Sequence, residues 1–149
     1  MKKLIIYILL FTVSFSYSQK KELRNANKFF VSGEYASAID LLDSSRELFE
    51  SSDDKIKSQA MLLYGKIHTA MEDFDLAMKA FDMSRNLGTS DQLLNPEINK
   101  LETALITSAV GDNETENYLA AAKKLKMVYD LKKNVNQEYL YYAASSAVN

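Results

Sequence analysis

The stretch from Met61 to Phe81 constrains the fold most, because it has the spacing of two short helices separated by a polar break. In its first half, one helix face follows the i, i+3, i+4, i+7 pattern and consists of Met61, Tyr64, Gly65 and His68. Residues 72–75 interrupt this pattern with polar, turn-forming side chains. A second stripe follows, formed by Ala77, Phe81 and Ser84. The pattern predicts a helix, a tight turn and a second helix, which Gly88 ends in a left-handed conformation.

Gly65 and Ala77 predict how these two helices pack. Helices of about 13 to 16 residues are unstable alone in water, so each must pack against a neighbour. A residue without a side chain and a residue with only a methyl group let two helix backbones approach closely. Phe81 is expected to fill the space beside that contact. The stretch therefore predicts one tightly packed helix pair.

The same residues resemble the tetratricopeptide repeat, whose pattern is W-x2-L-G-x2-Y followed by A-x3-F over about 34 residues. The corresponding residues here are Met61-x2-Tyr64-Gly65-x2-His68, followed by Ala77-x3-Phe81. Gly, Ala and Phe are kept, whereas Met, Tyr and His replace Trp, Leu and Tyr. The resemblance implies an all-α chain in which antiparallel helix-turn-helix repeats stack as a right-handed α-solenoid.

Similar units flank this pair. We expect repeats over about residues 20–50, 52–88 and 95–133, and a partial repeat over 136–149, as the N-terminal part of a longer array. Together they form one expected domain over residues 19–149. The resemblance assigns repeat packing to ten residues: Ala38, Met61, Tyr64, Gly65, His68, Ala77, Phe81, Ala121, Tyr142 and Ala143.

Capping residues predict where several helices begin and end. One of the serines at 51–52 is expected to cap the first helix of the second repeat, and Asp75 its second helix. Asn95 followed by Pro96 is typical of a helix start, because the missing N–H of proline costs nothing in the first turn. Residues 111–113 are expected to end that helix.

Residues 1–18 have the three parts of a signal peptide. Two lysines begin the segment, residues 4–13 form an apolar run too short for a membrane span, and a polar tail ends at Ser18. Cleavage there makes Gln19 the N-terminus and predicts a periplasmic or secreted protein. The alternative is an uncleaved N-terminal anchor. This arrangement resembles the exported tetratricopeptide proteins of flavobacteria and other Bacteroidetes.

The charge and cysteine content exclude several classes of function. Removing Lys2 and Lys3 from the 18 basic residues leaves 16 against 20 acidic ones, a net charge of −4. A mildly acidic chain argues against nucleic-acid binding, which usually requires a clustered basic surface. The chain has no cysteine, so it holds no disulfide, thiolate metal site or lipidated cysteine.

No motif in the sequence predicts catalysis or a cofactor. His68 is the single histidine, and zinc normally needs three or four protein ligands, so we interpret it as a structural residue of the repeat. Asp73 and Asp75 lack the glycine and distant glutamate of a calcium loop. Neither a glycine-rich phosphate loop nor a Gly-x-Ser-x-Gly elbow is present. Lys124 and its neighbouring lysines are interpreted as a solvated helix face.

The resemblance also implies where a partner binds. In the tetratricopeptide family the first helices of the pairs line a concave groove, and the matching positions are Leu23, Asn27, Phe30, Leu62, Lys66 and Thr69. A protein or peptide is the implied partner, with Phe30 as an apolar anchor. Leucines at 23, 62 and 63 stand where a carboxylate clamp needs polar side chains, which argues against such a clamp. The alternative is that these side chains only seal the repeats against each other.

These features predict an exported, non-catalytic scaffold that mediates protein–protein interaction in the cell envelope, without a transmembrane segment after signal cleavage. The alternative is a helical accessory domain of a larger envelope protein, whose enzymatic or peptidoglycan-binding region lies beyond residue 149. Residues 139–148 are largely apolar, and an uncapped apolar stripe favours association. Self-association through this C-terminal segment is therefore a further expectation.

Overall fold

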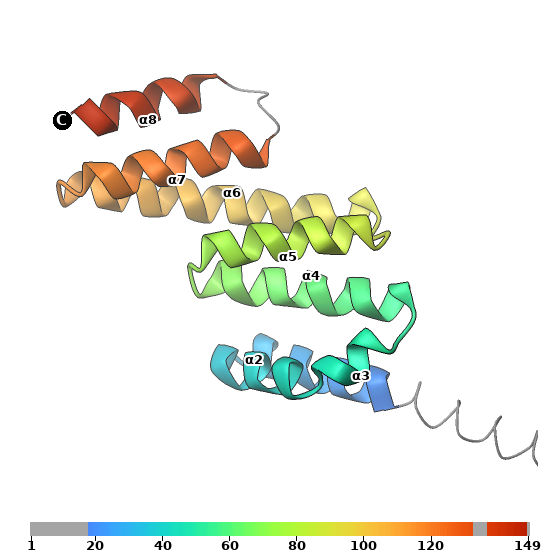
Figure 1. Cartoon of the computed structure of the whole chain (residues 1–149). Helices are drawn as coiled ribbons and strands as arrows, with labels where there is room; N and C mark the ends of the chain where they lie inside the picture. The colour runs from blue at the N-terminus through green and yellow to red at the C-terminus, as the bar shows by residue number, and fades with distance from the viewer. Residues whose placement is uncertain (1–17, 133–136, 149) are drawn as a thin grey trace, which may run out of the picture.

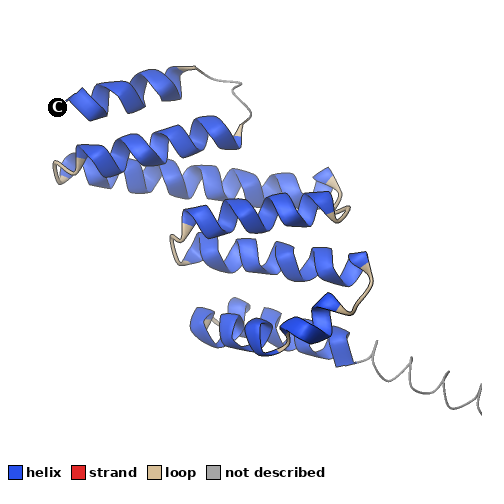
Figure 2. Cartoon of the chain, viewed as in Figure 1, coloured by secondary structure: helices blue, strands red, loops and turns tan. Residues whose placement is uncertain are grey.

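The computed structural model describes residues 18–132 and 137–148, and residues 1–17 of the predicted signal peptide lie outside these ranges. A helix over residues 18–31 comes first. It is followed by α2 (Tyr35–Ser44), α3 (Arg46–Glu50), α4 (Asp54–Ala70), α5 (Phe74–Asn86), α6 (Asp91–Glu114), α7 (Tyr118–Leu131) and α8 (Glu138–Val148). The described residues include no strand (Figure 2), which confirms the predicted all-α class.

The helices form a stack that runs from the N-terminal helices to α8 (Figure 1). α4 and α5 form one antiparallel pair, and α6 and α7 form the next. α6 also contacts both α4 and α5, and α8 packs against α7. Each helix beyond the first pair is therefore held mainly by its neighbours in sequence, as expected for a repeat-like chain.

The pair α4 and α5 has the close contact that the sequence predicts. Ala77 is fully buried and Phe81 is 1% exposed. The ring of Phe81 lies against the α-carbon of Gly65, and a β-carbon at that glycine would stand only 2.4 Å from a ring carbon. Position 65 therefore has room for glycine alone, because real β-carbons do not approach other heavy atoms below about 3.0 Å.

Four of the turns share one backbone geometry. The residue after the helix cap has a positive φ, of 78° at Gly33, 61° at Glu72, 95° at Gly88 and 60° at Glu116. Around Glu72, its own N–H donates to the Thr69 carbonyl, and the next N–H donates to the His68 carbonyl. This is the Schellman motif, and the same bonds recur at the other three turns. It confirms the predicted left-handed stop at Gly88. Glutamate at two of these positions was not predicted, because L-residues lose about 1–2 kcal/mol in this conformation.

Two predicted helix starts in the first half are wrong. Asp53, not a serine at 51–52, caps α4, and its carboxylate accepts from the Ile56 N–H at 2.8 Å. The Ser51 and Ser52 hydroxyls instead donate to carbonyls of the preceding turn. α5 begins at Phe74 and its cap position is Asp73, two residues earlier than predicted, so Asp75 lies in the first turn of the helix rather than at its cap.

The boundaries of α6 also differ from the prediction. α6 begins at Asp91, so Pro96 lies inside the helix instead of in its first turn. The added turn places Leu94 in the core, where it is fully buried, and this burial offsets the one backbone hydrogen bond that proline cannot donate. The helix continues through Gly111 and ends at Glu114, because the left-handed position falls at Glu116.

Candidate binding groove

One face of α4 carries three of the six residues predicted to line a groove. Leu62, Lys66 and Thr69 are spaced by four and three residues, so they lie in one stripe along the helix. Between this stripe and the helix over residues 18–31 lies a hollow of about 660 Å³, and Leu23 and Asn27 line it from the opposite side. The structure thus brings four of the six predicted groove residues together: Leu23, Asn27, Leu62 and Lys66.

The other two predicted residues lie beside this hollow rather than in it. Phe30 is partly buried against the core, and the Lys66 ammonium lies 5.0 Å above its ring centroid. Phe30 therefore supports Lys66 through a cation–π contact instead of offering a free anchor. Thr69 lines a second hollow of about 610 Å³ between α4 and α6, and its hydroxyl donates to the Gly65 carbonyl at 2.7 Å.

Positive charge surrounds the first hollow, and it was not predicted from the sequence. Lys20, Arg24, Lys55 and Lys66 line it, against the single carboxylate of Asp53. The Asp53 carboxylate is already used to cap α4. The signal in the sequence was the spacing of four residues between Lys20 and Arg24, and of eleven between Lys55 and Lys66, which places each pair on one helix face.

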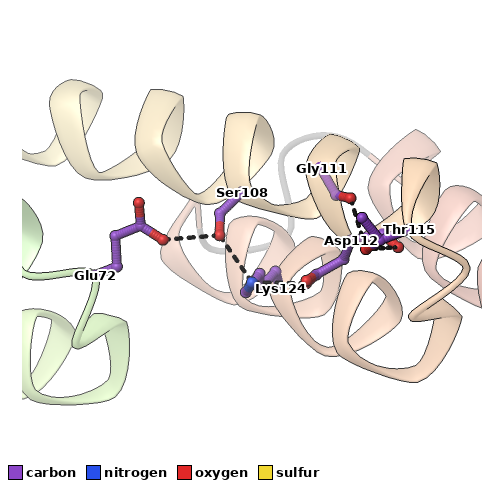
Figure 3. Close-up of polar contacts among 6 residues, drawn as sticks. All are labelled: Glu72, Ser108, Gly111, Asp112, Thr115 and Lys124. Carbon is purple, nitrogen blue, oxygen red and sulfur yellow. Dashed lines mark hydrogen bonds and ion pairs between the residues drawn. The ribbon is translucent and has the colours of Figure 1, made fainter.

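A chain of polar contacts forms the wall of the second hollow (Figure 3). The Ser108 hydroxyl donates to Glu72 Oε2 at 3.1 Å, and Lys124 Nζ donates to Ser108 Oγ at 2.8 Å. Lys124 also forms an ion pair with Asp112 at 2.6 Å. This corrects the interpretation of Lys124 as part of a solvated face. The network ties the turn after α4 to α6 and α7, and so holds successive helix pairs together.

A serine beside a lysine raises the question of nucleophilic catalysis. A lysine that acts as general base must be neutral to take the hydroxyl proton. Here Lys124 Nζ is ion-paired with the Asp112 carboxylate, and the Ser108 hydroxyl donates to Glu72 instead of to Lys124. The contacts that these residues form join the turn after α4 to α6 and α7.

The opposite face of α4 carries the predicted packing residues Met61, Tyr64 and His68, which are half-buried. They line an apolar groove of about 550 Å³ between α3 and α5. His68 stacks on Tyr64 and lies 3.4 Å from the Asp73 carboxylate. Of the other predicted packing residues, one is 50% exposed, Tyr142, and six are buried: Ala38, Gly65, Ala77, Phe81, Ala121 and Ala143.

Tyr64 is fixed by a short hydrogen bond. Its hydroxyl donates to Asp43 Oδ1 at 2.6 Å, and Arg46 Nη2 donates to the same oxygen at 3.0 Å. Burial, followed by the hydrogen bond to the Asp43 carboxylate, raises the pKa of Tyr64 well above its ordinary value. The same hydrogen bond lowers the pKa of Asp43. The pair anchors α4 to the end of α2.

We expect the Tyr64 hydroxyl to ionise above the ordinary pH range of a tyrosine, because its pKa is raised. A raised pKa means that its contribution to stability is complete below pH 10 and is lost as the pH rises through the folded pKa. In an absorbance titration, Tyr64→Phe should remove the latest phenolate signal and flatten the fall of stability above pH 10. Tyr141→Phe is the control, because Tyr141 is 72% exposed and lies on α8, away from the Tyr64–Asp43 hydrogen bond. Identical late signals in both variants would contradict this assignment.

Across the described ranges, no group of histidine or acidic residues is arranged to hold a metal ion. No helix there has the length and apolar character needed to cross a membrane. Comparisons with protein-family models, with curated proteins and with solved structures gave no match. The two hollows on the face of α4 that carries Leu62, Lys66 and Thr69 are named here the groove along α4. Its geometry and charge are the basis for a proposed function.

Proposed function

We propose that the protein is an exported, non-catalytic scaffold that binds another protein through the groove along α4. The observation that supports this proposal most is that four predicted groove residues surround one hollow. They are Leu23 and Asn27, on the helix over residues 18–31, and Leu62 and Lys66, on α4. The hollow combines leucine side chains with amide groups and with cations that form no ion pair among the described residues, a mixed apolar and polar lining that suits a peptide. The repeated Schellman turns and the Gly65–Phe81 contact support a tetratricopeptide-like solenoid as its framework.

Site-specific photo-crosslinking in the intact cell envelope tests this function. A photoreactive residue at position 62, inside the hollow, should give one discrete crosslinked protein. The control places the same residue at position 119, because Leu119 is 63% exposed on α7 and outside the groove. The purified partner should bind the wild-type chain and bind a Leu62→Glu variant far more weakly. Equal crosslinking from both positions would overturn the proposal.

The export part of the proposal rests on the lysine pair and the apolar run of residues 4–13. The N-terminal sequence of the protein isolated from the envelope fraction should begin at Gln19 or within a residue or two of it. A cytoplasmic protein that keeps Met1 would contradict export without affecting the groove.

Self-association through the C-terminal segment remains part of the proposal. Tyr141 and Tyr142, on α8, are 72% and 50% exposed, and aromatic side chains are favoured at interfaces. Light scattering over a range of concentrations should show a mass that rises with concentration and falls when Tyr141 is replaced by Glu. A constant monomer mass would contradict this part.

A further inference from the structure

We propose that the groove along α4 binds an extended acidic segment and fixes its orientation by charge. Acidic residues of the segment lie between α4 and the helix over residues 18–31, and a cationic residue lies near Glu72. The inference rests on the proposed binding function and adds the chemistry and direction of the bound segment. Three properties of the groove support it: its length, the excess of cations at one end and an unpaired carboxylate at the other.

The two hollows follow each other along one face of α4. Lys55 and Lys66 line the first hollow and Thr69 lines the second, and all three belong to one helical stripe. At about 1.5 Å per residue, the distance along the helix from Lys55 to Thr69 is about 21 Å. An extended chain covers that distance with about six residues. A short linear segment therefore reaches both ends of the groove.

The first hollow is strongly basic. Lys20, Arg24 and Lys55 form no ion pair within the described part of the chain. The one lining carboxylate, Asp53, accepts a hydrogen bond from the backbone of its own helix. Carboxylates of a bound segment would gain charge-assisted hydrogen bonds from these cations. This end favours acidic residues.

The second hollow has the opposite charge. Its two lining carboxylates are Glu72 and Asp112. Asp112 is neutralised by Lys124, whereas Glu72 accepts only from the neutral hydroxyl of Ser108 (Figure 3). Glu72 is thus the carboxylate of this hollow without an ion pair among the described residues. A lysine or arginine of the bound segment would complete the pair.

Between the two ends the floor is apolar. Leu62 is half-buried and Leu63 is 4% exposed, and both line the first hollow with Leu23. The middle of the segment should therefore carry leucine-like side chains. Apolar contact supplies affinity, while the charges at the two ends supply orientation.

Fluorescence anisotropy with short labelled peptides tests the inference. The first probe is Glu-Glu-Leu-Ala-Leu-Lys with blocked ends, and the second replaces both glutamates with lysine. The acidic peptide should bind the full chain at least about tenfold more tightly, and added salt should weaken it, because the cations are exposed to solvent. A DNA oligomer of equal charge serves as a control and should bind less tightly, since it cannot use the leucine floor.

Matched variants then test which end of the groove binds the acidic residues of the peptide and which end binds its lysine. Arg24→Glu combined with Lys55→Glu should reduce affinity for the acidic peptide at least about tenfold. Lys79→Glu combined with Lys126→Glu makes the same charge change outside the groove along α4 and should leave affinity within about twofold. Glu72→Gln keeps an acceptor for Ser108 but removes the charge. Without this charge, the acidic peptide that ends in lysine and a version that ends in alanine should bind equally well. The acidic peptide should still bind more tightly than the peptide in which lysine replaces both glutamates.

The outcomes separate this inference from the proposed function. Equal binding of the acidic and basic peptides, equal loss in both double variants, or DNA binding as tight as the peptide would each overturn it. A partner crosslinked at position 62 together with any of these results would leave the scaffold function standing. Circular dichroism of each variant confirms that the helices are intact.

Discussion

Replacing Phe81 with alanine is expected to destabilise the fold by about 3–5 kcal/mol, the usual cost of removing a buried aromatic ring. Phe81 is 1% exposed and packs in the core cluster that joins α5 to α6. It also lies directly against Gly65 on α4, so the neighbouring backbone cannot collapse into the cavity without bending a helix. Domains of this size are stable by only about 5–15 kcal/mol, so the variant should lose a large part of its free energy of unfolding.

Urea unfolding followed by circular dichroism measures the effect. Leu119→Ala removes a comparable apolar group from the surface, where Leu119 is 63% exposed, and should change stability by less than about 0.5 kcal/mol. A similar midpoint for Phe81→Ala and Leu119→Ala would mean that the α4–α5 packing is not as described.

The central helix pair could be predicted from the sequence because its determinants are local. Gly65, Ala77 and Phe81 lie within one stretch, and their sizes and spacing dictate both the helical period and the close contact. The left-handed stop at Gly88 could be predicted for the same reason, since only glycine adopts a positive φ without cost.

Other features depend on contacts that the local pattern does not contain. Pro96 suggested a helix start, but burial of Leu94 by other helices extends α6 past it. Glu72 adopts a left-handed conformation that glutamate disfavours alone, and its hydrogen bond from Ser108 comes from 36 residues away. The break between α2 and α3 at Ser45 carries no glycine or proline to signal it.

Four of the six residues predicted to line a groove lie around one hollow, but the charge of that hollow was not predicted. The leucines and Lys66 followed from the repeat positions, whereas Lys20, Arg24 and Lys55 belong to two helices whose relative placement only the fold provides. Similarly, Lys124 looked solvated in the sequence, because its partner Asp112 lies on the preceding helix. Charge pairing across helices is a property of packing, which explains why the sequence did not predict the charge of this hollow.

Alanine substitutions at two helical glycines, Gly65 and Gly111, should change the free energy of unfolding in opposite directions. Alanine favours a helix over glycine by about 1 kcal/mol, so either substitution would stabilise a free helix. At Gly111, in α6, an added β-carbon meets nothing within 4 Å, and Gly111→Ala should stabilise the protein by up to about 1 kcal/mol. At Gly65 the β-carbon would stand 2.4, 2.5 and 2.9 Å from three atoms of the Phe81 ring.

The buried ring cannot move aside, so steric overlap decides the outcome at Gly65. Overpacking of a core costs about 1–3 kcal/mol and occasionally more, and this contact is at the severe end of that range. We expect Gly65→Ala to destabilise the protein by about 2 kcal/mol after the helix gain is subtracted. In the Phe81→Ala background the ring is absent, and the same substitution should become stabilising. This double-mutant cycle isolates the contact between the two residues, and additive effects of Gly65→Ala and Phe81→Ala would show that they do not touch.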